Sequence, residues 1–156
     1  AMKTDFLAAS YGQEPKDPEH AERLQKFYDY FPDLHRWCEN QRKKTTYVES
    51  VLGRRLWVNT YNNGYERNNL NHPHQSSAAD QMKMAITKMH KNWKFDYPFA
   101  VVGVVHDECI LDISKEIAQD VAKFVEDCMV SVAEEMCPGV PFVAEAGIGN
   151  SWRDSK

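Results

Sequence analysis

The residue types best suited to catalysis stand together inside an apolar run, VVHDECIL, at residues 104–111. Two adjacent carboxylates, Asp107 and Glu108, follow His106 there. Burying an ionised carboxylate without a partner costs several kcal/mol, so such a pair is retained where a cation or hydrogen-bond donors compensate it. Hard oxygen ligands suit Mg²⁺, which binds through one or two carboxylates together with water and substrate phosphates. The alternative interpretation is a polar hairpin tip exposed to water.

A second polar pattern lies upstream, where Arg67, Asn71 and Gln75 are spaced by four residues. In a helix this spacing places the three side chains in one row. Each carries donors that suit the acceptors of a DNA minor groove or the oxygens of sugar and phosphate. The alternative is an ordinary solvated helix face.

Charge is unevenly distributed along the 156 residues, whose formal net charge is −4. Residues 36–94 hold eleven Lys/Arg and four Asp/Glu, which gives +7, and the remaining residues carry −11. A basic middle between acidic ends is what a phosphate-contacting face needs. A chance cluster on a solvated helix would give the same count.

Composition narrows the class of protein. With 42% hydrophobic and 12% aromatic residues, the chain can bury a core, which argues against disorder. No apolar run approaches the roughly 20 residues that a membrane span needs, so we expect no membrane partner. The four cysteines are scattered without a CxxC pair, which argues against a cysteine zinc site and favours a reducing compartment.

The first half of the chain is expected to contain helices followed by a short hairpin. Asp17 and Pro18 are suited to cap and begin a helix with apolar residues at helical spacing, which Pro32 interrupts. A second helical stretch follows it. Two short strands are expected within residues 46–59, meeting near Gly53.

The second half is expected to place the carboxylates on a hairpin between helices. A loop-like stretch at 59–69 leads to a helix at 76–93, and two β-rich runs at 99–113 form a hairpin with the HDE sequence near its turn. Ser114 is expected to cap the next helix, and residues 141–149 to form a last strand. Helices packed on a small antiparallel sheet define an α+β fold.

These patterns together resemble DNA polymerase family A, the family of bacterial DNA polymerase I. HDE within a hydrophobic hairpin is similar to that family's motif C. The stretch ERNNLNHPHQSSAAD at 66–80 is similar to its ER-x-x-x-N-x-P-x-Q-G-T-A-A-D block, with Ser76 and Ser77 in place of Gly and Thr. Residues 52–55 resemble its LGRR element. The C-terminal residues that also match are Glu145, Gly147, Gly149, Asn150 and Trp152.

The resemblance implies template-directed nucleotidyl transfer by a DNA-directed DNA polymerase. Asp107 and Glu108 would ligate the catalytic metals, Glu108 directly or through a neighbouring ligand, and His106 would touch the primer terminus. Two Mg²⁺ ions would activate the primer 3′-hydroxyl and neutralise the leaving pyrophosphate.

The same resemblance implies partners for the remaining polar residues. Arg67, Asn71 and Gln75 would line the minor groove of the primer–template DNA, and Arg54 of the LGRR element would contact DNA as well.

The first residues match the spacing of the family's fingers helix, K-x7-YG. Lys3 would meet the phosphates of the incoming dNTP and Tyr11 its base, whereas Leu7 stands where the family usually has the Phe or Tyr that influences sugar discrimination. Residues 1–15 are therefore expected to be a remnant of the fingers helix with its connector, and residues 16–156 the palm subdomain.

The family's motif A, which supplies a second catalytic Asp, has no match in this sequence. We therefore expect a naturally split polymerase, such as one of a phage, in which an N-terminal subunit brings motif A and the isolated chain is inactive. The expected location is the cytoplasm of a bacterium or of a phage-infected host. A truncated palm is also expected to expose an apolar surface. The alternatives are a non-catalytic palm-like module that binds primer–template DNA or regulates a polymerase, and a relic without function.

Overall fold

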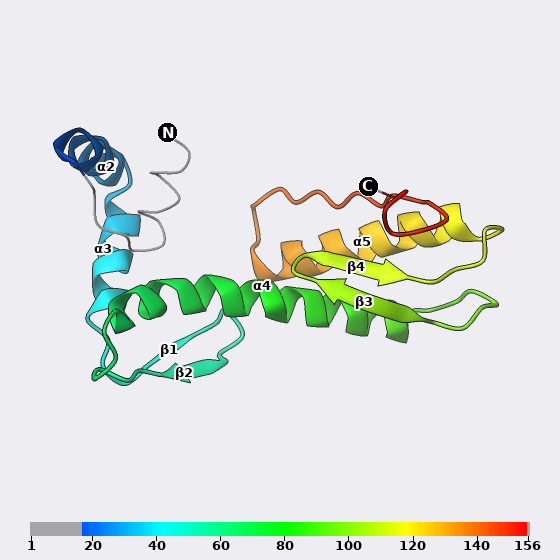
Figure 1. Cartoon of the computed structure of the whole chain (residues 1–156), viewed down its shortest axis with the longest axis horizontal. Helices are drawn as coiled ribbons and strands as arrows, with labels where there is room; N and C mark the ends of the chain where they lie inside the picture. Colours follow the sequence, from blue (N-terminus) through cyan, green and yellow to red (C-terminus); the bar gives the residue numbers. More distant parts are fainter. Residues whose placement is uncertain (1–16, 156) are drawn as a thin grey trace. The chain divides into compact units, whose positions relative to one another are not determined.

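The computed structural model describes residues 17–155, which form helices α2–α5 and two antiparallel hairpins, an α+β fold (Figure 1). The chain divides into two compact units, one reaching Ser77 and the other starting at Ala78. None of the helices in this described stretch is both long and apolar enough to cross a membrane.

Two short helices open the first unit, α2 over Pro18–Tyr30 and α3 over Pro32–Arg42. Asp17 caps α2 as the sequence predicts, because its Oδ1 accepts a hydrogen bond from the backbone N–H of His20 at 2.7 Å. Each helix has a proline in its first turn, where the missing N–H costs nothing. The predicted interruption between the two helices is confirmed.

The predicted strand pair is also confirmed, as β1 over Tyr47–Glu49 and β2 over Arg55–Trp57. The strands are antiparallel. Gly53 lies in their turn with φ +81°, a left-handed conformation that favours glycine, and its N–H donates to Ser50 O at 2.9 Å.

Helix α4 runs from Tyr65 to Lys91, so it begins well before the predicted start at Ser76. A loop was expected at residues 59–69, and this was wrong for residues 65–69, which are helical. Asn69 is 1% exposed, and its amide nitrogen donates to three backbone carbonyl oxygens that follow or end α3, those of Gln41, Arg42 and Lys44. This buried anchor outweighs the weak helix propensity of the local Asn-rich sequence.

The second unit contains the predicted hairpin, β3 over Val101–Val105 and β4 over Glu108–Leu111. Val105 pairs with Glu108, so a two-residue loop joins the strands. The expectation that the HDE sequence lies at the turn is confirmed.

Helix α5 spans Ala118–Met136, and its N-cap is Ile117, three residues later than predicted. Ser114 does not cap it, because residues 114–117 form a separate turn closed by a bond from Ile117 N–H to Ser114 O at 3.2 Å. Ile113 and Ile117, which flank this turn, both pack against the core. The helix begins only after Ile117.

The core of the second unit lies between α4, α5 and the hairpin. Its buried members are Ala85, Met89, Val121, Val125, Cys128 and Val132. Around them Trp93 packs edge to face on Phe99 and Phe124, with ring centroids 5.0 and 5.9 Å apart. Fully burying a Val or Met side chain contributes about 1.5–3 kcal/mol, and Leu111 of β4 packs against this cluster.

After α5 the chain returns along the helix as an extended trace (Figure 1). The strand predicted at 141–149 is not formed within the described residues, because a strand requires a neighbour to complete its backbone ladder and no described strand pairs with this segment. Ala146 N–H instead donates to Glu126 Oε1 on α5 at 2.7 Å.

Candidate active site

The two-residue loop of the β3–β4 hairpin displays the acidic pair. His106 takes the first loop position with φ +54°, a conformation rare for residues other than glycine. Two-residue hairpin loops need such a positive φ because it matches the right-handed twist of the flanking strands. Asp107 takes the second position and Glu108 is the first residue of β4.

The two carboxylates have different surroundings. Asp107 is exposed and makes no hydrogen bond or ion pair with any part of the chain that the structure describes. Glu108 is half-buried, and its Oε2 accepts a hydrogen bond from Trp152 Nε1 at 3.1 Å. Burial raises the pKa of the neighbouring Cys109 thiol, so this thiol stays protonated at neutral pH and adds no negative charge.

The donor chemistry of this pair fits Mg²⁺. Two adjacent carboxylates at an accessible loop provide hard oxygen ligands, and Mg²⁺ commonly uses one or two of these and completes its shell with water or phosphate oxygens. Residues 17–155 contain no cluster of three or more His, Cys, Asp or Glu side chains suited to a metal ion.

The predicted polar row lies on the part of α4 that belongs to the first unit. Arg67 and Gln75 are exposed, and the Arg67 guanidinium folds over Gly64, with Nη2 only 2.9 Å from where a Cβ would stand. Asn71 is half-buried, and its buried Oδ1 has no hydrogen-bond partner among residues 17–155. Asn71 is therefore the least accessible of the three. The row and the acidic pair belong to different units.

His74 lies beside Gln75 on α4, with its ring 5.3 Å from that of Trp37. Partial burial lowers the pKa of His74, which keeps its imidazole neutral at pH 7.

Arg54 holds the β1–β2 turn against α4. Its Nη2 donates to the backbone oxygen of Ser76 at 3.1 Å, and its N–H donates to Ser50 Oγ at 3.1 Å. Ser77 Oγ accepts from Val51 N–H at 2.9 Å, so the two serines of the SSAAD sequence both contact the turn. Arg54 remains exposed, as a DNA contact requires.

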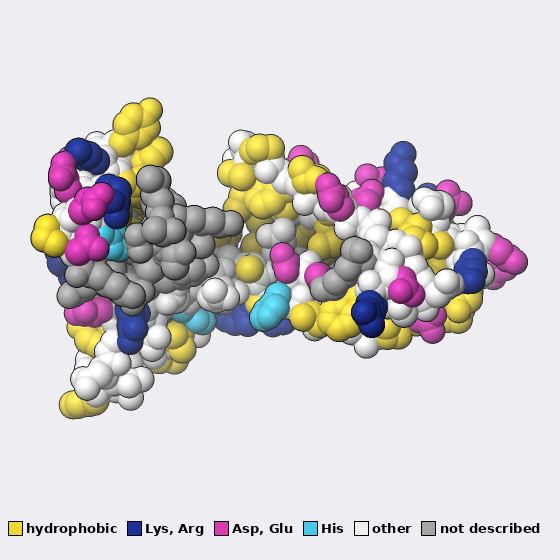
Figure 2. All heavy atoms as spheres, turned by 45° about the horizontal axis from the view of Figure 1, so that its top comes forward, with side chains coloured by type: hydrophobic (Ala, Val, Ile, Leu, Met, Phe, Trp, Pro, Cys, Tyr) yellow, Lys and Arg dark blue, Asp and Glu magenta, His cyan; other side chains and the backbone are white. Residues whose placement is uncertain are grey.

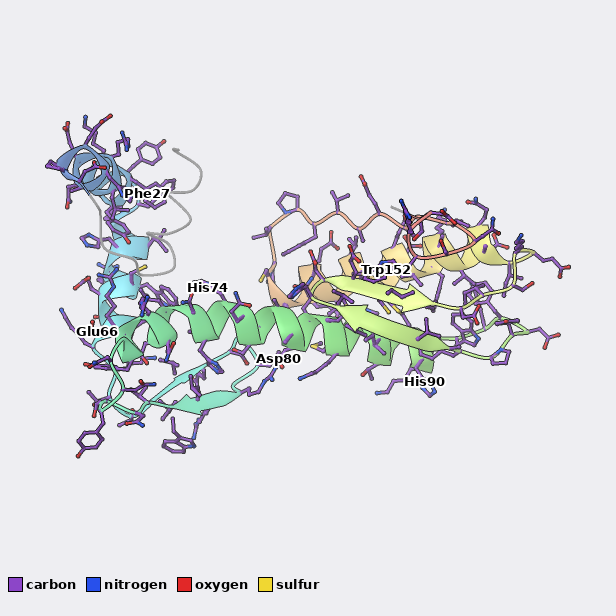
Figure 3. All side chains as sticks on the ribbon, in the orientation of Figure 1. Phe27, Glu66, His74, Asp80, His90 and Trp152 are labelled. Atoms are coloured by element: carbon purple, nitrogen blue, oxygen red, sulfur yellow. The ribbon has the colours of Figure 1, made fainter. Side chains whose placement is uncertain are left out.

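The remaining predicted nucleotide contacts, Lys3, Leu7 and Tyr11, lie outside the described residues. Figure 3 draws the side chains of the rest and labels Trp152 beside β4. The sequence identifies Trp152 only as part of a C-terminal motif and predicts no role for Asn69. No local pattern could have linked Trp152 to Glu108, because 44 residues separate them and their contact depends on the fold.

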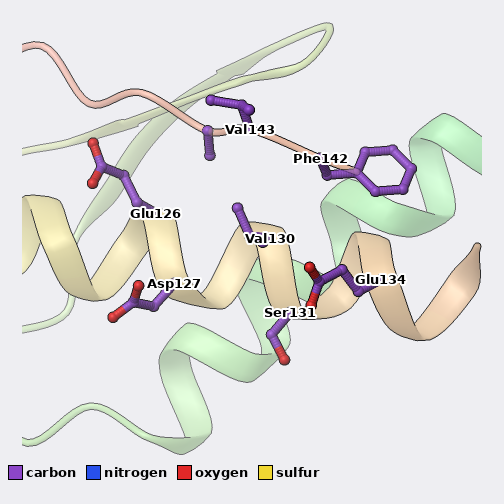
Figure 4. Close-up of a pocket in the computed structure, with 8 residues that line it drawn as sticks. Glu126, Asp127, Val130, Ser131, Glu134, Phe142 and Val143 are labelled. Carbon is purple, nitrogen blue, oxygen red and sulfur yellow. The ribbon is translucent and has the colours of Figure 1, made fainter. Parts of the chain in front are cut away.

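The second unit also has a hollow of about 330 Å³ between α5 and the returning C-terminal segment (Figure 4). Glu126, Asp127 and Glu134 line its helix side, and Phe142 and Val143 line the other. The HDE residues are not part of its lining, so it is separate from the candidate active site.

Comparison with known proteins connects these motifs to one family. The family model described as DNA polymerase family A matches residues 2–154. The chain is 30% identical over 143 residues to a thermostable DNA polymerase I of Thermus aquaticus, covering 85% of this chain and 17% of that protein. It is 27% identical over 166 aligned positions to DNA polymerase I of Pseudomonas aeruginosa, covering 99% of this chain and 18% of that one.

A solved structure has the same fold. It is the POL domain of Pol1 from M. smegmatis in complex with DNA primer-template and dNTP, and it superposes with a TM-score of 0.79 at 24% identity. The match covers 98% of this chain and 30% of that one. The chain thus spans less than a fifth of the two curated relatives named above. The motif C hairpin, the helical block on α4 and the match over residues 2–154 together show that this chain belongs to DNA polymerase family A.

Proposed function

We propose that this chain supplies the motif C part of the active site of a DNA-directed DNA polymerase. The observation that carries the proposal is the acidic pair itself: Asp107 is exposed at a hairpin loop and Glu108 is tethered beside it. An exposed loop between apolar strands is a suitable place for metal-bound phosphates to approach. The reaction is template-directed transfer of a nucleotide to a primer end.

The acidic pair has distinct tasks in this proposal. Asp107 provides an accessible carboxylate for Mg²⁺, and Glu108 adds a second whose direction is set by its hydrogen bond. When bound, two Mg²⁺ ions would activate the primer 3′-hydroxyl and offset the charge of the leaving pyrophosphate. We assign His106, which is exposed beside Asp107, to contact with the primer terminus.

The DNA contacts come from the basic middle of the chain. We assign Arg67, Asn71, Gln75 and Arg54 to the primer–template duplex, because they lie within residues 36–94, which carry +7. Contacts of this kind to groove acceptors and phosphates position a duplex without reading its sequence. Lys3, Leu7 and Tyr11 are assigned to the incoming dNTP on the motif resemblance.

An additional aspartate, from a segment carrying motif A, completes the proposed site. We propose that a partner chain provides it and that the isolated chain is inactive. The exposed face of β3 supports a covering segment, because Val102 and Val104 are 63% and 47% exposed. Figure 2 shows hydrophobic side chains reaching the surface among charged ones. Exposed apolar side chains on a two-stranded sheet are typical of a surface that another element covers.

Primer extension tests this proposal. The purified chain is incubated with primer–template DNA, dNTPs and Mg²⁺, alone and with a polypeptide carrying the motif A segment of a family A polymerase. We expect extension only in the mixture, and only with template and Mg²⁺ present. Template-directed extension by the chain alone would overturn the need for a partner. No extension by a mixture that co-elutes as a complex would contradict the polymerase proposal.

A further inference from the structure

The C-terminal turn, residues 151–155, contacts the acidic pair through the side chain of Trp152. Trp152 Nε1 donates to Glu108 Oε2 at 3.1 Å. An indole has one donor and no acceptor, so the direction of this bond is unambiguous. This hydrogen bond constrains the Glu108 carboxylate, next to Asp107 in the sequence, and the neutral indole adds no positive charge.

The backbone before the turn is shaped to deliver this contact. Ala146 N–H is held by Glu126 Oε1 on α5, and the chain then folds back on itself at Gly147 and Gly149. A Cβ added at Gly147 would stand 1.7 Å from the backbone oxygen of Ser155, which no side chain could accommodate. At Gly149 a Cβ would stand 2.7 Å from a backbone carbon of the turn. Only glycine permits this close return.

Hydrogen bonds within the turn then fix its shape. Ser151 Oγ donates to Asp154 Oδ2 at 2.7 Å, and Asp154 N–H donates to Ser151 O at 3.0 Å. Ser155 Oγ donates to the backbone oxygen of Trp152 at 2.9 Å. The indole is therefore presented by a braced turn, although it is 46% exposed. Such exposure makes core packing a poor explanation for its placement.

We propose that Trp152 is a positioning residue, which orients the Glu108 carboxylate toward a divalent cation shared with Asp107. The inference rests on the proposed function. A free glutamate side chain samples several rotamers, and fixing it costs up to about 2 kcal/mol in entropy. The hydrogen bond from Trp152 orients the Glu108 side chain before a cation binds. Groups that orient metal ligands in this way typically change metal affinity by about 10–100-fold when they are removed.

The test follows Mn²⁺ binding to the full chain by paramagnetic broadening of backbone amide signals in NMR. We expect the amides of Asp107 and Glu108 to broaden before those of other acidic residues. Trp152→Phe, which keeps an aromatic ring but removes the donor, should raise the Mn²⁺ concentration needed by about tenfold. Trp57→Phe is the matched control, because Trp57 is 70% exposed on β2, and it should leave the titration unchanged.

A measurement without metal separates the two proposals. Side-chain couplings of Glu108 should report one rotamer in the natural chain and averaging in Trp152→Phe. Gly147→Ala, which displaces the turn without changing the indole, should reproduce both effects, and unchanged core amide signals would show that each variant is folded. Unaltered Mn²⁺ broadening in Trp152→Phe would overturn the positioning role and leave the motif C proposal standing. Absence of selective broadening in the natural chain would overturn both.

Discussion

His106 is the residue whose backbone is under the most evident constraint. It holds φ +54° in the loop that presents Asp107, and a left-handed conformation costs an ordinary L-residue about 1–2 kcal/mol. The surrounding pairing of Val105 with Glu108 imposes it. The geometry of the acidic pair therefore depends on a residue that can tolerate a positive φ.

Substitution at residue 106 should separate backbone tolerance from side-chain chemistry. His106→Gly should be more stable than His106→Val by about 1–2 kcal/mol, because a β-branched residue is disfavoured at positive φ. Urea denaturation of the two variants measures this difference. Equal stability would mean that the loop does not require this conformation.

Helix α4 is the element that sequence reasoning located least well. Its later part was predicted from apolar spacing, and Met82, Ala85 and Met89 are indeed buried. The start at Tyr65 could not be predicted, because it depends on Asn69 bonding to carbonyls that are 25–28 residues away. The helix also contains Pro73, a residue that disfavours the interior of a helix. Tertiary contacts compensate for this local preference.

The same distinction explains the rest of the fold. The Asp17 cap and the Gly53 turn follow local rules and were predicted correctly, whereas the predicted Ser114 cap was wrong. A strand depends on a neighbour, so an apolar pattern at 141–149 alone could not decide it. The candidate site follows this division, since the HDE turn was predictable and the Trp152 contact was not.

Asn69 offers a test at this scale. Asn69→Asp removes the amide donor at nearly constant shape and should destabilise the chain by about 2–3 kcal/mol. The backbone carbonyl oxygens that Asn69 contacts lose their donor, and a carboxylate oxygen then faces them. Asn68→Asp is the control, because Asn68 is exposed, and its effect should stay within about 0.5 kcal/mol. Chemical denaturation reports both values. Similar small effects would show that α4 is not anchored in this way.

Packing of α5 on α4 includes an ion pair with a pH dependence of known sign. Lys88 Nζ donates to Glu135 Oε1 at 2.5 Å, and this bond lowers the pKa of Glu135 below its usual 4.5. Because the folded pKa lies below the unfolded one, the stabilisation is present above pH 4.5 and is lost as the pH falls through the folded pKa.

Glu135→Gln should therefore be less stable than the natural chain at pH 7, and the difference should shrink as the medium is acidified below pH 4.5. Denaturation curves over a pH series measure it. Glu134→Gln, which alters the adjacent exposed carboxyl, should show no such convergence. A deficit of Glu135→Gln that stays constant at every pH would contradict the ion-pair explanation.

The whole chain combines a basic middle with acidic ends. The +7 of residues 36–94 includes the polar row on α4, whereas the remaining residues carry −11. Phosphate contacts release counterions, so their number is measured by the salt dependence of binding. This property distinguishes residues that bind DNA from residues that bind metal.

Binding of primer–template DNA should weaken steeply with salt, and Arg67→Ala should lower the slope of log K against log[salt] by about 0.9 if Arg67 contacts one phosphate. Fluorescence anisotropy without divalent metal is the measurement. Arg23→Ala is the control, because Arg23 pairs with Glu19 on α2 outside the basic segment. An unchanged slope for Arg67→Ala would remove this residue from the proposed DNA contacts.

The most direct test of the central claim is primer extension by the complex with a motif A polypeptide, using two matched substitutions. Asp107→Asn should reduce the rate by at least about a hundredfold, because a metal-binding carboxylate supports several kcal/mol of charge stabilisation in the transition state. Asp112→Asn, which changes an exposed carboxylate just beyond β4, should leave the rate nearly unchanged. Equal rates for the two variants would contradict the assignment of Asp107 to the catalytic metal site.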